Sequence, residues 1–235
     1  SLLAARRQTR GRGRLGNRWL SSPGGDLTFS FLWLGLASLR EAGTLPLACA
    51  LGLCDFASSF AFEARCRWPN DVMAASGKLA GILTEAMPDS DRVVLVVGVG
   101  LNLVRDPGRD RGLEKPAASL DELIGRRLGQ EETLARLLPF LAARINAWER
   151  EGFAAIKPDL EARLWGVGEM VSARTGGGAA QGRIIGLGDG GELLLESEAG
   201  IVVAVSSAAA LDWPAASGGT RAAPPPAREA PPPES

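Results

Sequence analysis

Long apolar runs in the first part of the chain predict a sheet. Asp26–Leu34 and Asp91–Leu103 are nearly continuous apolar runs of strand length, and the second is rich in β-branched residues on both faces. Between them, Lys78–Ala86 places alternate residues on opposite faces of a strand. A turn separates this run from Asp91–Leu103, which predicts a hairpin of long antiparallel strands at the centre of a mixed sheet. Shorter runs at Ser1–Arg7 and Ala64–Trp68 add two strands.

Apolar residues at three- and four-residue spacing predict helices. The longest is Gln130–Glu151, an amphipathic segment in which Pro139 is expected to introduce a kink. Its predicted buried stripe consists of Leu134, Leu137, Leu138, Leu141, Ile145 and Trp148. Thr44–Phe62 is typical of a buried helix, with Thr44 as its N-cap. Two further helices are predicted, one from the capping-box spacing that begins at Ser119 and one over Phe153–Leu164.

The pattern changes from Gly168 onward. Four short β-type runs alternate with glycine-rich turns, at Glu169–Thr175, Gln181–Leu187, Glu192–Glu196 and Ile201–Val205. This spacing predicts a small β-barrel or sandwich. The end of the chain is rich in Pro, Ala and Gly and has little to bury, so we expect it to be disordered. The predicted domains are therefore residues 1–165, 166–211 and a tail over 212–235.

Composition limits the chemistry. The chain has 235 residues, 46% of them hydrophobic and 23% charged, and a formal net charge of −1, so nucleic acid cannot be the partner of its whole surface. It contains no His and no Tyr, which excludes a Ser-His-Asp triad and His metal ligands. The three cysteines form no CxxC pair, and no apolar run approaches the roughly 18 residues that span a bilayer. We therefore expect a cytoplasmic protein with reduced thiols.

Basic charge is concentrated in one segment, Gln8–Trp19 (QTRGRGRLGNRW). It contains four arginines and three glycines but almost no apolar side chain to bury. Guanidinium groups suit phosphate or carboxylate, and glycines let backbone amides approach a ligand. By itself the segment fits two interpretations equally well: an anion-binding loop that orders around its ligand, or a solvated basic arm of the kind that binds nucleic acid.

Three more segments place polar residues within or next to apolar strands, where a buried core would disfavour them. They are Arg67–Asp71 (RWPND), Gly77–Leu83 (GKLAGIL) and Gly98–Asn102 (GVGLN). Each has an ordinary explanation by itself, as a turn, a solvated strand end or a bulge. In order, the four segments resemble the biotin–protein ligases, the biotin–[acetyl-CoA-carboxylase] ligase family. The resemblance implies an α+β fold, with a mixed, largely antiparallel sheet flanked by helices as in class II synthetases, and a small C-terminal SH3-like barrel.

The resemblance also implies a reaction and its partners. These enzymes make biotinyl-5′-AMP from biotin, ATP and Mg²⁺, and then pass biotin to a Lys of a biotin carboxyl carrier domain. The residues that would contact biotin are Gln8, Arg12, Gly13, Arg14, Lys78, Gly81 and Leu83. Those around the nucleotide would be Trp19, Arg67, Asn70 and Asn102. Lys78, Asp71 and Arg14 would be catalytic, with Asp71 steering or deprotonating the carrier Lys. No metal site on the protein, nucleic acid or membrane partner is implied, and the chain would be a monomer or weak homodimer.

Departures from the family pattern qualify this expectation. Arg67 stands where the family usually has Lys, and Asn17 replaces a commonly basic residue. The family also has an upstream Ser-Thr-Asn segment, so we expect an N-terminally incomplete record of a monofunctional ligase without a DNA-binding domain. Two alternatives stay open: a degenerate ligase that binds biotin or adenylate without efficient transfer, and a lipoate–protein ligase.

Overall fold

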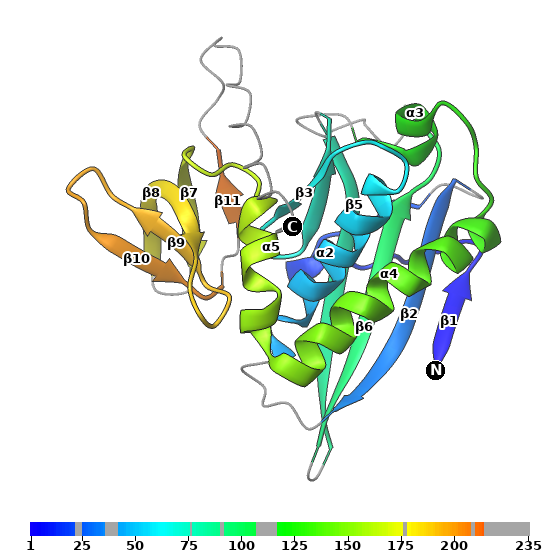
Figure 1. Cartoon of the computed structure of the whole chain (residues 1–235), viewed down its shortest axis with the longest axis horizontal. Coiled ribbons are helices and arrows are strands. Elements are labelled where there is room, and N and C mark those ends of the chain that lie inside the picture. The colour runs from blue at the N-terminus through cyan, green and yellow to red at the C-terminus, as the bar shows by residue number, and fades with distance from the viewer. Residues whose placement is uncertain are drawn as a thin grey trace, which may run out of the picture.

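The computed structural model describes residues 1–21, 25–35, 42–75, 77–89, 92–106, 117–175, 178–207 and 210–213. Its larger part is a six-stranded sheet with helices packed on one face (Figure 1). The strands are β1 (Leu2–Ala5), β2 (Asp26–Gly35), β3 (Ala64–Arg67), β4 (Asp71–Ala74), β5 (Gly77–Asp89) and β6 (Arg92–Asn102). They lie in the order β1-β2-β6-β5-β4-β3, so the two longest apolar strands are central.

The predicted central hairpin is confirmed. Strands β5 and β6 pair antiparallel along their whole length, with Ile82 opposite Val99 and Gly81 opposite Gly100. Every neighbouring pair in this sheet is antiparallel. The expectation of a mixed sheet was therefore wrong for the described strands, because the only parallel contact there is an isolated bridge between Cys66 and Leu164. Short hairpin connections explain the antiparallel pairing of β3 with β4, of β4 with β5 and of β5 with β6.

Helices cover the sheet on the side opposite the basic segment. The helical elements are η1 (Arg14–Gly16), α2 (Leu45–Ser58), α3 (Leu120–Ile124), α4 (Gln130–Glu151), η2 (Phe153–Ala155) and α5 (Lys157–Ala162). Helix α2 is buried on nearly all sides, between the sheet and α4 (Figure 1). No helix in the described part of the chain is long and apolar enough to cross a membrane.

The structure refines the predicted helices in five details. Leu138 is 37% exposed, so the buried stripe of α4 is narrower than its spacing suggested. Helix α4 continues through Pro139, and the predicted kink there stays a prediction. Thr44 is the N-cap of α2 as predicted, but its hydroxyl makes no capping hydrogen bond and accepts a 2.7 Å hydrogen bond from the Trp148 indole instead. The segment Phe153–Leu164 is divided into η2 and α5, because Pro158 lies in the first turn of a new helix. Ser119 does precede α3, but its hydroxyl bonds carboxylates rather than the backbone.

A second, five-stranded antiparallel sheet follows. It contains β7 (Met170–Thr175), β8 (Gly178–Leu187), β9 (Leu193–Glu196), β10 (Val202–Val205) and β11 (Ala210–Asp212), in the order β10-β9-β8-β7-β11. Strand β11 was not predicted. It pairs Asp212 with Ser172, and the ring of Trp213, one residue beyond the strand, packs against Gly166, so neither residue belongs to the predicted tail. Residues 214–235, the rest of that tail, lie outside the described residues.

The two sheets share one hydrophobic core. The indole Nε1 of Trp68, just beyond β3, donates a buried 2.9 Å hydrogen bond to the carbonyl of Gly191 in the β8–β9 turn. The backbone N–H of Leu187 bonds Glu161 of α5 at 3.0 Å. Buried side chains from both sheets form a single cluster. This packing brings β11 beside the end of β3, where the RWPND segment begins.

Candidate active site

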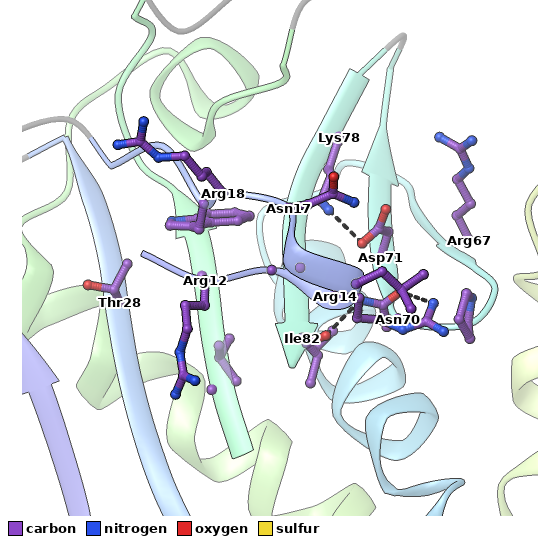
Figure 2. Close-up of a pocket in the computed structure, with 18 of the residues that line it drawn as sticks. Arg12, Arg14, Asn17, Arg18, Thr28, Arg67, Asn70, Asp71, Lys78 and Ile82 are labelled. Carbon is purple, nitrogen blue, oxygen red and sulfur yellow. Dashed lines mark hydrogen bonds and ion pairs between the residues drawn. The ribbon is translucent and has the colours of Figure 1, made fainter. Parts of the chain in front are cut away.

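Residues from all four singled-out segments meet at one cavity of about 380 Å³. Ten of the twelve predicted site residues line it: Gln8, Arg12, Gly13, Arg14, Trp19, Arg67, Asn70, Asp71, Lys78 and Gly81. The segment Gln8–Trp19 forms one wall, and strands β4, β5 and β6 form the floor. Figure 2 shows the side chains of this cavity. Leu83 and Asn102 are not among its lining residues.

An ion pair stands at the centre of the cavity. Lys78 Nζ lies 2.6 Å from Asp71 Oδ1 (Figure 2). Both residues lie near the starts of neighbouring antiparallel strands, Asp71 on β4 and Lys78 on β5, and the register shifts between Val72 and Met73. The two side chains are 38% and 21% exposed, so the pair is accessible from the cavity but rests on a rigid sheet. The Lys78 ammonium group and the Asp71 carboxylate are thus held next to each other at the cavity.

Asn70 connects the RWPND turn to the basic segment. Its Nδ2 donates to the Ile82 carbonyl at 2.7 Å, and its own carbonyl accepts from the Ile82 N–H at 2.8 Å. Its Oδ1 accepts a 3.3 Å hydrogen bond from Arg14 Nη1 (Figure 2). Burial lowers the pKa of the Arg14 guanidinium, while the negative charge of Asp71 acts in the opposite direction. The Asn70 side chain, which is bonded to Ile82 of β5, therefore holds Arg14 at the cavity.

The Trp19 ring lies on the sheet at two glycines. A Cβ atom on Gly100 would be 2.5 Å from the ring carbons Cε2 and Cζ2, and one on Gly81 would be 3.2 Å from Cζ3. Lys78 Nζ is 5.7 Å from the ring centroid, within range of a cation–π contact. Sequence reasoning missed the role of Gly100, although a glycine in a strongly apolar strand was a signal of close approach.

The basic segment is a compact turn. The Gly13 N–H bonds the Asn17 carbonyl at 2.7 Å, and the Trp19 N–H bonds the Gly11 carbonyl at 3.0 Å. Arg12 points away from the Lys78–Asp71 pair (Figure 2) and makes a 3.0 Å ion pair with Glu85 of β5. The segment packs on the sheet through Trp19 and lines the cavity, which favours a loop of the site over a solvated basic arm.

A second cavity, of about 670 Å³, lies on the other side of this turn. Leu83, Glu85 and Arg12 line it, so Leu83 is reached from there and not from the first cavity. Asn102 is buried and donates to the carbonyls of Lys78 at 2.9 Å and Ala118 at 3.1 Å. These bonds fix the backbone at the start of β5. The predicted contact of Asn102 with the nucleotide stays a prediction.

Comparisons with known proteins agree with the order of these segments. The sequence profile of the Biotin/lipoate A/B protein ligase family matches residues 1–102. The biotin–[acetyl-CoA-carboxylase] ligase of Paracoccus denitrificans is 36% identical over 208 residues, which cover 83% of this chain and 84% of the relative. The chain belongs to the biotin protein ligase family.

Two further relatives place this family member in context. The bifunctional ligase/repressor BirA of Bacillus subtilis is 30% identical over 204 residues, and the chain spans 63% of its length. A solved biotin protein ligase from Aquifex aeolicus, in complex with biotin and ATP, superposes with a TM-score of 0.76 at 29% identity, over 90% of this chain and 88% of that one. The α+β arrangement of antiparallel sheets and helices is thus the arrangement of a biotin protein ligase.

Proposed function

We propose that this protein activates biotin with MgATP to biotinyl-5′-AMP and then transfers biotin to a Lys of a carboxylase carrier domain. The observation that carries the proposal is the Lys78–Asp71 pair beside Arg14, in a cavity walled by the basic turn. Membership of the biotin protein ligase family supports it, as does the likeness to a relative solved with biotin and ATP.

The first step requires two anions to meet. A carboxylate oxygen of biotin attacks the α-phosphorus of ATP, the bond to the bridging oxygen breaks, and pyrophosphate leaves with that electron pair. Lys78 supplies a positive charge from a rigid strand, and Arg14 supplies a guanidinium that Asn70 orients. Cations held in place before the reaction lower the repulsion between the anions and stabilise the charge that develops.

The second step transfers the acyl group. The neutral amine of the carrier Lys attacks the carbonyl carbon of biotinyl-AMP, a C–N bond forms, and the C–O bond to phosphate breaks to release AMP. The proton of the attacking nitrogen passes to the Asp71 carboxylate. Asp71 is 21% exposed at the cavity, so an incoming amine can reach it.

The mixed anhydride must be kept from water between the steps. The turn over Gln8–Trp19 and the Trp19 ring lie across the floor strands and provide this cover. Mg²⁺ would enter bound to the ATP phosphates and would neutralise part of their negative charge.

We also propose that the second sheet is the SH3-like domain of these enzymes. Five short antiparallel strands joined by glycine-rich turns support this assignment. The division would fall near residue 165, with the catalytic domain before it. The second domain would extend to Trp213, two residues beyond the boundary expected from sequence.

The test is pyrophosphate release in the presence of ATP and biotin. We expect Lys78→Ala to abolish release with an unchanged circular dichroism spectrum. Lys157→Ala is the matched control, because Lys157 pairs with Asp189 on the surface, away from the cavity, and this variant should retain activity. Undiminished release by Lys78→Ala would refute the assignment.

Transfer is measured separately, by the intact mass of a carrier domain. A wild-type protein that releases pyrophosphate only with lipoate would be a lipoate ligase. One that binds biotin without modifying the carrier would be the degenerate form.

A further inference from the structure

Arg67 lies at the edge of the cavity with one described partner. It is the last residue of β3, directly opposite Asp71 in the β3–β4 register, and it lines the cavity. No carboxylate of the described residues pairs with it. Its contact is aromatic: the guanidinium carbon lies 5.2 Å from the centroid of the Trp213 ring.

Trp213 comes from the other sheet. It follows β11, which pairs with β7 through Leu211 opposite Ala173, and Leu211 itself lines the cavity. On the linker between the sheets, Gly166 has a φ of +79°, and a Cβ atom there would overlap the Trp213 ring. The ring is therefore held between a glycine of the linker and the guanidinium of Arg67.

This arrangement orients Arg67 without using its hydrogen bonds. A guanidinium held over an aromatic ring by a cation–π contact uses none of its five N–H donors there, so they stay available to an anion. A Lys ammonium offers three donors from a single point. The replacement of Lys by Arg at this position thus fits a site in which an aromatic ring sets the direction of the cation.

We propose that Trp213 is a positioning residue that holds Arg67 toward the phosphates of ATP. The C-terminal sheet thereby contributes to nucleotide affinity through one ring. The inference rests on the proposed function for the identity of the ligand. A cation–π contact of a partly desolvated pair predicts about three- to tenfold weaker ATP binding when the ring is removed.

The experiment is a double-mutant cycle on the full chain, with ATP and biotin affinities measured by calorimetry. Trp213→Ala should weaken ATP binding about three- to tenfold and leave the biotin Kd within about twofold. Trp213→Phe should retain most of the affinity, and Arg67→Lys should lose part of it. The double variant Arg67→Ala/Trp213→Ala should bind ATP like Arg67→Ala alone. Arg174→Ala is the control, because Arg174 lies on β7 and pairs with Asp212 at the surface.

The outcomes separate positioning from general packing. Additive losses, or equal weakening of ATP and biotin in Trp213→Ala, would overturn the proposal, since packing alone produces both. If Trp213→Ala fails to fold, the comparison of Trp213→Phe with Arg67→Lys decides, because only the positioning role predicts that the first binds ATP more tightly. A wild-type protein that shows this coupling but releases no pyrophosphate would refute the ligase function and leave the positioning intact.

Discussion

Adding one methyl group at Gly100 is expected to open the basic turn over the cavity. In the structure, a Cβ atom there would be 2.5 Å from Trp19 Cε2 and Cζ2 and 3.0 Å from Cη2. Carbon atoms pack at about 3.5–4.0 Å, so the ring and the methyl group must separate by about 1 Å or more. Gly100 is paired on both sides in the sheet, with Thr28 and with Gly81, so its backbone is fixed. The ring has to move.

The displacement acts on the turn more than on global stability. A rigid overpacked site would lose about 1–3 kcal/mol, but the Trp19 ring is on a surface segment that can lift away instead. Lifting forfeits its contact with Lys78, worth about 0.5–1 kcal/mol, and part of its packing on the sheet. A total of about 1.4 kcal/mol corresponds to a tenfold change in the open population. Replacement of glycine also stabilises the chain by about 0.4–1 kcal/mol, so global stability should change little.

Trypsin measures the open population directly, because four arginines lie in this segment. We expect cleavage at these arginines, located by mass spectrometry, to be about tenfold faster in Gly100→Ala. Gly98→Ala is the matched control two residues away on β6. A Cβ atom there has its nearest neighbours at 3.6 Å, ordinary contact distance, so cleavage should be unchanged. Equal cleavage rates in the two variants would refute the reasoning.

Two further predictions concern charged contacts. Burial raises the pKa of Asp55, but hydrogen bonds from Arg144 and Arg163 outweigh burial and leave the pKa below its ordinary value. The ionised carboxylate therefore stabilises the fold at pH values above the unfolded pKa of about 3.9. Asp55→Asn should therefore lower the free energy of unfolding by about 2 kcal/mol at pH 7, and urea titrations should show this difference shrinking as the pH falls through the lower folded pKa; a pH-independent difference contradicts the linkage. Glu85→Gln removes the Arg12 ion pair, whose side chains are 73% and 45% exposed, so trypsin cleavage should rise less than about threefold. A tenfold rise in cleavage would mean that the Arg12–Glu85 pair holds the basic turn closed.

Much of the fold could be predicted from the sequence because the periods of helices and strands are local features of the chain. The antiparallel hairpin of β5 and β6 and the full extent of α4 followed from alternation and from three- and four-residue spacing. The exposure of Leu138 could not be predicted, because residue spacing does not show how much of the helix surface the neighbouring elements will bury. Strand β11 was missed because three residues have no period, and pairing with β7 creates the strand.

The candidate site divides in the same way. Four motifs in order indicated Lys78, Asp71 and Arg14 through their resemblance to the biotin–protein ligases, since each motif alone also fits a turn, a strand end or a bulge. Only the tertiary structure decided how they meet. It placed Trp19 on Gly100, turned Arg12 toward Glu85 and brought Arg67 over the Trp213 ring. These contacts join residues from separate strands or separate sheets, and strand register and sheet packing set such distances, which no local pattern along a chain contains.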